Sequence, residues 1–194
     1  VGIDVGLQHF ATDTEGRKVS NPRHYQKAQS ELRRKQRKVA RRQKGSHRRK
    51  KAVQTLARAH RKVARMRLDF LHKTANDYIN NFQTICIEAL TVKDMVQNLS
   101  LRKSITDASW STFFELLSYL CPSGYKAEDA GRALVKVNPR NTSQNCSGCG
   151  QTVKKPLTVR QHQCPHCHLT LDRDLNAAIN IAARGGGQLL QMLT

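Results

Sequence analysis

The sequence predicts a mixed α/β fold that carries a small metal-binding module near its C-terminal end. Short apolar runs rich in β-branched residues occur at 1–5, 84–90 and 133–138, and they have the length of buried strands. Longer stretches between them repeat apolar residues at helical spacing. Two closely spaced cysteine pairs follow the third run. With 194 residues, the chain is long enough for one domain with a small appended module.

The first segment predicts an antiparallel meander of three strands. The run 1–5 is closed by Gly6, and "HFATD" and "KVSNP" supply two further strands. The intervening "TEGR" is a turn signal, and Pro22 ends the sheet segment. Because the chain opens directly on a strand, without a leader, we expect residues before Val1 in the native protein.

Residues 25–82 predict two helices joined by a turn at Gly45-Ser46. The second helix has the clearer apolar stripe, whereas the first has only Leu32, Val39 and Ala40 as anchors. Almost every charge here is positive, and such a run repels itself unless an anion neutralises it. A solvated helix face is the alternative. The candidate nucleic-acid contacts are Arg33, Arg34, Lys35, Arg37, Lys38, Arg41, Arg42, Arg48, Arg49, Lys50 and Lys51.

The charge of the whole chain also indicates a polyanionic partner. The formal net charge is +20 and the sequence pI is about 10.3. Nucleic acid is the first candidate and an anionic membrane the second. No apolar run approaches the ~20 residues that a membrane span needs, and no signal peptide is visible. We therefore expect a nucleic-acid partner, no membrane contact, and a place in the prokaryotic cytoplasm or nucleoid.

The second half of the chain predicts more helices and one more strand. Residues 107–120 form a helical pattern, with Trp110, Phe113, Leu117 and Leu120 on one side. The segment "CPSG" interrupts this pattern, and "YKAEDAGR" resumes it before the strand at 133–138. A last helix, "DLNAAINIAAR", is expected to end at the glycines 185–187, because glycine is a common helix stop.

Four cysteines predict a zinc site. Cys146 and Cys149 form one CxxC pair, and Cys164 and Cys167 form a second pair about fourteen residues later. This is the arrangement of a zinc ribbon, in which each pair chelates from one tight turn. Four thiolates close a tetrahedral shell, so the zinc is expected to be structural. The neighbouring histidines could compete as ligands, but the cysteines already fill the shell.

Three acids stand out because the chain has only 14 Asp and Glu residues. Asp4 lies inside the first apolar strand, Glu88 closes "ICIE", and Asp174 opens the last helix. Burying a carboxylate is costly unless a cation or hydrogen bonds compensate. A cluster of such carboxylates is suited to Mg²⁺ or Mn²⁺, and paired ions support phosphodiester hydrolysis. The alternatives are an N-cap for Asp174, an edge charge for Glu88 and a turn contact for Asp4.

The order of these motifs resembles a known family. The chain contains "GIDVGL", a basic helical hairpin, "IEAL" and "DASW", then "TSQNCSGCG" and "DRDLNAAIN". It is similar in this to the RuvC-like nuclease domain of the TnpB (OrfB) proteins of insertion sequences, which type V CRISPR effectors share. The resemblance covers nearly the whole chain, and the last two motifs are its most specific parts.

The resemblance implies an RNase H-like fold with an inserted zinc ribbon, and RNA-guided DNA cleavage at an Asp–Glu–Asp metal site. The matching residues are Asp4, Glu88 and Asp174, with Asp172 in reserve and Asn176 in support. The implied partners are DNA and a guide RNA. The chain then divides into first core strands at 1–22, the basic hairpin at 23–83, the continued core at 84–140, the ribbon at 141–171, and the last helix and tail at 172–194.

Two other interpretations fit parts of the sequence. One is a truncated transposon protein that binds nucleic acid through the hairpin and ribbon without cutting it. The other is an RNA-associated zinc-ribbon protein, which leaves Asp4 and Glu88 unexplained.

Overall fold

The computed structural model describes residues 1–121, 132–156 and 158–193. A five-stranded sheet forms its centre, in the order β3-β2-β1-β4-β5. Strands β1 (Gly2–Val5), β2 (His9–Asp13) and β3 (Lys18–Ser20) form the expected antiparallel meander. Strands β4 (Thr84–Glu88) and β5 (Ala133–Val137) continue the sheet in parallel with β1. The mixed α/β prediction is therefore confirmed.

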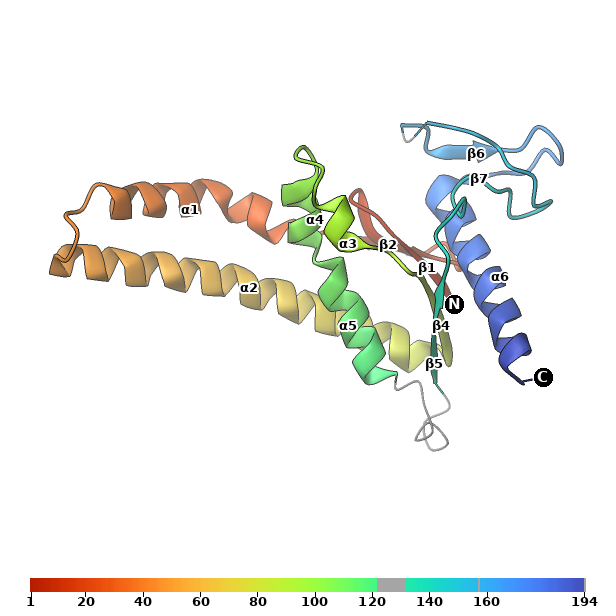
Figure 1. The fold of residues 1–194 in the computed structure, drawn as a ribbon, viewed down its shortest axis with the longest axis horizontal. Helices are drawn as coiled ribbons and strands as arrows, with labels where there is room; N and C mark the ends of the chain where they lie inside the picture. Colours follow the sequence, from red (N-terminus) through yellow and green to blue (C-terminus); the bar gives the residue numbers. More distant parts are fainter. Residues whose placement is uncertain (122–131, 157, 194) are drawn as a thin grey trace.

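Helices cover both faces of this sheet (Figure 1). Helices α2 (His47–Asn81) and α5 (Trp110–Leu120) pack against one face, where Ile3, Ile85 and Ile87 are fully buried. Helix α6 (Arg173–Leu193) packs against the other face, beside Cys86 and Val135. The alternation of side chains along a strand thus divides the core into two layers.

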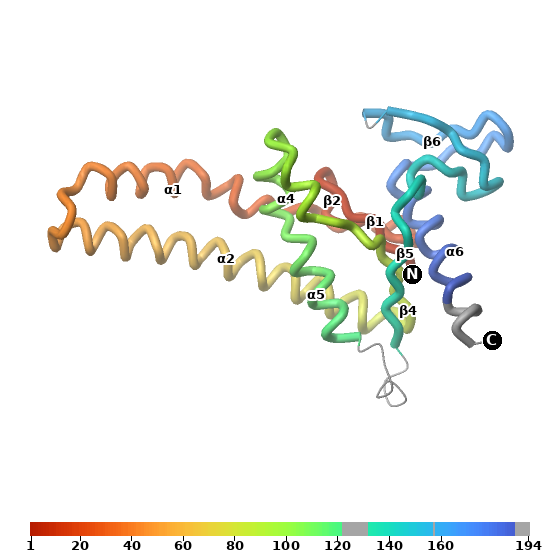
Figure 2. Tube along the Cα trace, in the orientation of Figure 1, coloured from red at the N-terminus to blue at the C-terminus, as the bar shows by residue number. Residues whose placement is uncertain are grey.

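The basic segment forms a long helical hairpin that extends away from the sheet (Figure 2). Helix α1 (His24–Ala40) and helix α2 lie side by side, joined by the turn that Gly45 and Ser46 predict. The Ser46 hydroxyl accepts a hydrogen bond from the N–H of Arg49 at 3.2 Å and caps α2. Leu32 is the only fully buried residue of α1, so the hairpin is held mainly through α2.

The helix expected at 107–120 is two helices in the structure. Helix α4 (Arg102–Ala108) ends at Ser109, whose φ of +55° lies in the left-handed region, and α5 begins directly after it. The short helix α3 (Val92–Met95) precedes α4. The carboxylate of Asp107 accepts hydrogen bonds from the N–H groups of Tyr25 and Gln26, so the end of α4 caps the start of α1. The helix expected over "YKAEDAGR" falls almost entirely outside the described residues.

The prediction that the glycines 185–187 end the last helix is wrong. Helix α6 continues through them to Leu193. A Cβ atom on Gly185 would lie 2.2 Å from the Sγ of Cys86, and one on Gly2 would lie 2.2 Å from the backbone oxygen of Ala178. These two glycines therefore allow α6 to approach the sheet closely, and tertiary packing outweighs the low helix propensity of glycine.

A second, two-stranded sheet supports the cysteine-rich segment. Strands β6 (Gln161–Gln163) and β7 (Thr170–Asp172) pair antiparallel and lead directly into α6. Among the described residues, no helix is long and apolar enough to cross a membrane.

Candidate metal centres and nucleic-acid surface

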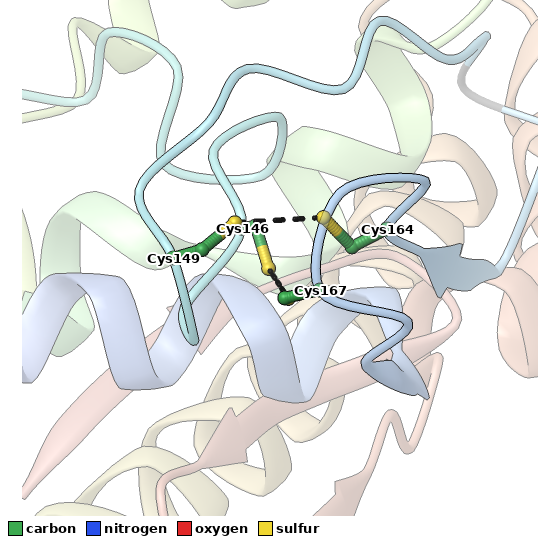
Figure 3. A group of neighbouring side chains, drawn as sticks. All are labelled: Cys146, Cys149, Cys164 and Cys167. Carbon is green, nitrogen blue, oxygen red and sulfur yellow. Dashed lines mark hydrogen bonds between the residues drawn. The ribbon is translucent and has the colours of Figure 1, made fainter.

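The four predicted cysteines come together in space (Figure 3). The Sγ atoms of Cys146 and Cys167 are 3.5 Å apart, and those of Cys149 and Cys164 are 3.6 Å apart. All four sulfurs lie within 4.8 Å of one another. A tetrahedral Zn²⁺ site with Zn–S bonds of about 2.3 Å needs sulfurs about 3.8 Å apart. The donor set and its spacing therefore fit a closed zinc site.

Both cysteine pairs are shaped by the same backbone pattern. The N–H of Gly150 donates to the carbonyl of Cys146, and the N–H of His168 donates to the carbonyl of Cys164. Backbone N–H groups directed at the sulfur of Cys164 lower the pKa of that thiol to about 6, with the N–H of Cys167 contributing most. A low thiol pKa favours the thiolate, which is the form that binds metal. This electrostatic effect favours the thiolate at Cys164, whereas, despite backbone hydrogen bonds from Gln151 and Leu169, burial and the neighbouring thiols raise the pKa of Cys149 and Cys167.

The three predicted acids lie on the face of the sheet that α6 covers. Gly2 pairs with Cys86 and Ile3 with Ile87 in the parallel register of β1 and β4, which places Asp4 beside Glu88. Asp174 lies in the first turn of α6, which packs along β1. The side chain of Asp174 is 17% exposed, and Arg160 Nη1 is 3.7 Å from its Oδ1. Three segments that are distant in sequence therefore contribute carboxylates to one region.

The electrostatics of Asp4 show that these carboxylates interact. Burial raises the pKa of Asp4 well above its usual value, and the charges of Glu88 and Asp174 raise it further. Burial also raises the pKa of Glu88, although a hydrogen bond from Thr142 and the charge of Arg184 oppose this shift. The ionised forms are thus poorly compensated by the protein. A divalent cation would supply that compensation, and the hard oxygen donors suit Mg²⁺ or Mn²⁺.

The carboxylates are not gathered as tightly as the cysteines. Among the described residues, the cysteine cluster alone brings three or more Cys, His, Asp or Glu ligand atoms within 4.8 Å of one another. The oxygens would have to move closer together to share one ion.

The two aspartates around Arg173 have different contacts. Asp172 Oδ1 accepts hydrogen bonds from the N–H groups of Asp174 at 2.9 Å and Leu175 at 3.4 Å, and its Oδ2 accepts one from Lys18 Nζ at 2.7 Å. Asp172 therefore caps α6. Asp174 makes no such cap, and its negative charge helps to raise the pKa of Asp4.

Sequence reasoning missed several residues around the acids. The Thr142 hydroxyl donates to Glu88, and Asn180 holds the backbone of the segment that contains Thr142. Arg184 Nη1 donates to the carbonyls of Asn138 at 2.7 Å and Arg140 at 2.8 Å. The resemblance implied that Asn176 supports the site, and its side chain donates to the carbonyl of Asn145. No pattern in the sequence marks Thr142, Asn180 or Arg184.

Most of the predicted basic contacts line two grooves on the hairpin. The larger groove is lined by Ser30, Arg33, Arg34, Lys35, Arg37, Lys38, Arg41, Arg42 and Thr55. The smaller one adds Arg48 and Lys51. Arg49 and Lys50 line neither groove, and Arg49 Nη1 instead donates to the carbonyl of Arg42 at 3.2 Å, which steadies the hairpin turn. A further basic group on α2, outside the predicted set, consists of Arg58, Arg61, Lys62 and Arg65.

Comparison with known families agrees with this architecture. The model of the IS605 OrfB family, described as "Probable transposase", matches residues 1–99, which is about half of the chain. The chain belongs to this OrfB family. A second model, the TNB domain of Cas12f1-like proteins, matches residues 110–181 of the OrfB chain.

The curated relatives of this OrfB chain are longer proteins. It is 40% identical over 187 residues to a "Putative RNA-guided DNA endonuclease" of Streptomyces pristinaespiralis, covering 95% of this chain and 45% of the relative. The "Putative RNA-guided DNA endonuclease InsQ" of Escherichia coli K12 is 32% identical, with 95% and 48% covered. The chain thus spans about half the length of the curated relatives it matches.

A solved structure shows a similar fold. The cryo-EM structure of a Cas12f1–sgRNA–target DNA complex aligns with a TM-score of 0.59 at 19% identity, over 93% of this OrfB chain and 48% of that chain. At this identity the likeness concerns the fold alone.

Proposed function

We propose that this OrfB-family chain is the nuclease part of an RNA-guided DNA endonuclease, with Asp4, Glu88 and Asp174 as its catalytic carboxylates. Membership of the OrfB family supports this proposal, as do the printed names of the relatives. We further propose that the central sheet is an RNase H-like core. The strand order β3-β2-β1-β4-β5, with its antiparallel meander followed by parallel strands, supports that assignment. The segments 1–22, 84–140 and 172–194 would form this core, with the hairpin at 23–83 and the ribbon at 141–171 as insertions.

The main observation behind the proposal is the convergence of carboxylates on one face of the sheet. Asp4 and Glu88 lie on adjacent parallel strands, and their pKa values are raised by burial and, for Asp4, by its acidic neighbours. Divalent ions bound there would supply an activated water and stabilise the leaving oxygen of a phosphodiester. The carboxylates would hold and orient those ions. Helix α6 would exclude bulk water from one side of the site.

The hairpin is proposed to hold a nucleic-acid duplex by its phosphates. Seven cations of the larger groove lie between Arg33 and Arg42. The ten residues from Arg33 to Arg42, eight in α1 and two just past its end, span about 14 Å at the rise of a helix, and B-DNA carries one phosphate charge per about 1.7 Å of its axis. The charge density of the groove is therefore close to that of a duplex. A guide–target duplex and the displaced strand both supply such phosphates.

The proposed zinc site would be structural. Four cysteines leave no open coordination position for a substrate. Zinc would fix the segment that leads through β7 into α6, and hence the helix that carries Asp174.

The neighbouring aspartates provide a matched test of this function. Labelled DNA is incubated with the chain, Mg²⁺ or Mn²⁺ and, in parallel reactions, an RNA complementary to the DNA target. The parent protein is expected to cut, and Asp174→Asn to lose cutting by at least about 10²-fold, since a metal ligand would be removed. Asp172→Asn is expected to keep cutting and to change stability by less than about 1 kcal/mol, because asparagine also caps a helix and the half-exposed ion pair with Lys18 contributes little.

Equal activity of Asp174→Asn and the parent would show that the site is assigned wrongly. If neither protein cuts under any of these conditions while both retain DNA, the alternative gains support. In that case the chain binds nucleic acid without cutting it. The wide spacing of the carboxylates among the described residues is the observation that favours this alternative.

A further inference from the structure

A chain of hydrogen bonds joins the first cysteine pair to Glu88. Thr142 lies four residues before Cys146 and is buried, with 4% of its surface exposed. Its Oγ1 lies within hydrogen-bond distance of Glu88 Oε1 and is 3.0 Å from the carbonyl oxygen of Pro139. A hydroxyl has a single hydrogen to donate. An ionised carboxylate is the stronger acceptor of the two, so the hydrogen goes to Glu88.

The same segment is fastened to α6 by two asparagines, one helical turn apart. Asn176 is fully buried, accepts a hydrogen bond from the N–H of Ser147 at 2.9 Å and donates to the carbonyl of Asn145 at 2.8 Å. Asn180 Nδ2 lies 2.8 Å from the carbonyl oxygens of both Thr142 and Asn145. The loop is thus fixed relative to α6 before it reaches the first zinc ligand.

Two catalytic carboxylates consequently depend on one loop. Asp174 lies on the same helix as Asn176 and Asn180, whereas Glu88 lies on β4 on the far side of the site. The loop 142–147 contacts both, because its backbone binds α6 and its Thr142 hydroxyl binds Glu88. Cys146, within this loop, belongs to the cysteine cluster. The fold of the first cysteine pair therefore bears on the position of Glu88 relative to Asp174.

We infer that Thr142 is a positioning residue. Its hydroxyl links the first zinc knuckle, which is the turn that carries Cys146 and Cys149, to the carboxylate of Glu88 and so fixes the orientation of that carboxylate. This inference rests on the proposed function, in which Glu88 is a metal ligand. Partners that hydrogen-bond to a metal ligand restrict its orientation, and their loss typically weakens metal affinity 10- to 100-fold. Without its hydroxyl partner, the Glu88 side chain would sample orientations that do not bind the ion.

Three variants separate this role from a merely structural one. Thr142→Val keeps the shape of the side chain and removes the hydroxyl. Thr142→Ser keeps the hydroxyl and removes a methyl group. Thr152→Val is the matched control, because the Thr152 hydroxyl belongs to the same knuckle but donates to Asn145 Oδ1 at 3.0 Å and is exposed.

The measurement is Mn²⁺ binding by isothermal titration calorimetry on the zinc-loaded full chain without nucleic acid, followed by cleavage at several Mn²⁺ concentrations. Thr142→Val is expected to weaken Mn²⁺ binding by about tenfold or more. Thr142→Ser is expected to restore it, and Thr152→Val to match the parent. In the cleavage assay, the Mn²⁺ concentration that gives the half-maximal rate should rise for Thr142→Val alone. The zinc content should be the same in the parent and the three variants.

Two results would overturn the inference. One is Mn²⁺ affinity of Thr142→Val equal to that of the parent, and the other is failure of Thr142→Ser to restore it. If the parent binds Mn²⁺ but does not cut DNA, the nuclease proposal fails while the Mn²⁺ comparison still decides the role of Thr142. If the parent binds no Mn²⁺, both proposals fall.

Discussion

At the scale of single residues, Asp4 carries an electrostatic cost that the protein alone does not relieve. Its pKa is raised well above the usual value of 3.8 by burial first, and then by Glu88 and Asp174. At pH values between the pKa of Asp4 in the unfolded chain and its higher pKa in the folded protein, the native state binds a proton that the unfolded state has lost. Stability therefore falls as the pH rises through this window and stays reduced at neutral pH.

We expect Asp4→Asn to stabilise the protein in buffer free of Mg²⁺ and Mn²⁺ at neutral pH, while it abolishes metal-dependent cleavage. Removing the buried charge should raise the Tm by about 2–4 °C for each kcal/mol relieved. This gain should shrink as the pH falls toward 4, because Asp4 is then protonated in the folded state and becomes increasingly protonated in the unfolded state, whose pKa is near 3.8. Thermal unfolding from pH 4 to 8 measures the effect.

The exposed carboxylate of Asp94 provides the control for this comparison. The Tm of Asp94→Asn should stay close to that of the parent at every pH tested, because the Asp94 side chain is exposed to solvent. Adding Mg²⁺ should stabilise the parent more than Asp4→Asn. A parent that is more stable than Asp4→Asn without divalent ions would contradict the electrostatic account.

At the scale of elements, α6 is positioned by glycines that face different surroundings. A Cβ on Gly185 would meet the Sγ of Cys86 at 2.2 Å, whereas a Cβ on Gly186 would meet nothing within 4 Å. Gly186 is also exposed. A side chain at position 185 would therefore clash with β4, whereas a side chain at position 186 would extend into open space.

We expect Gly185→Ala and Gly186→Ala to change stability in opposite directions. Gly185→Ala should destabilise by about 1–3 kcal/mol, because the new methyl group overpacks the contact between α6 and β4. Gly186→Ala should stabilise by about 0.5–1 kcal/mol, because alanine favours a helix over glycine. Urea unfolding of both variants measures this. A stabilising Gly185→Ala would show that α6 does not approach β4 this closely.

These glycines also show where prediction from sequence succeeded and failed. The runs at 1–5 and 84–90 predicted buried strands because their composition is local information, and Gly45-Ser46 predicted the hairpin turn for the same reason. The glycines 185–187 suggested a helix end because the contact that explains Gly185 is with Cys86, about a hundred residues away in sequence. The break at Ser109 was not predicted, because a left-handed backbone conformation is usually signalled by glycine and this position holds a serine.

The candidate site divides in the same way. The cysteine spacing predicted the cluster of four thiols, and the acids were singled out by their apolar surroundings. Thr142 and Asn180 carry no local signal, since their importance comes from contacts with Glu88 and with the loop around Asn145. Only the folded chain shows such contacts.

At the scale of the whole molecule, the cysteine cluster brings together the two halves of the segment 141–171, which packs next to α6. Zinc removal should expose the segment 141–171 and lower the Tm, because metal binding contributes to folding free energy. We propose that the parent binds one zinc ion through the four cysteines, and we expect Cys149→Ser to lose most of it, as measured by elemental analysis. Cys86→Ala, which alters a buried cysteine outside the cluster, should retain the zinc. Loss of zinc from both variants would contradict the four-cysteine assignment.

The charge of the hairpin makes a separate prediction about nucleic-acid binding. Replacing four groove cations, Arg34, Arg37, Lys38 and Arg41, by glutamine should weaken duplex binding and reduce the slope of log K against log salt by about 3–4. The matched control replaces four exposed lysines elsewhere, Lys73, Lys93, Lys136 and Lys154. Fluorescence anisotropy from 50 to 300 mM salt measures both slopes. Equal losses in the two proteins would mean that binding follows total charge rather than the groove.

The packing of α6 on β1 has a consequence for synthesis on the ribosome. The surface of Gly2 is covered by Ala178 and Ala182, which are translated 176 and 180 residues after Gly2. At about 5–20 residues per second, β1 waits roughly ten to thirty seconds for its covering helix. A nascent chain that stops before residue 174 holds Asp4 and Glu88 but lacks the third carboxylate. Prematurely terminated products of the gene would thus be unable to assemble the site, however well their first strands fold.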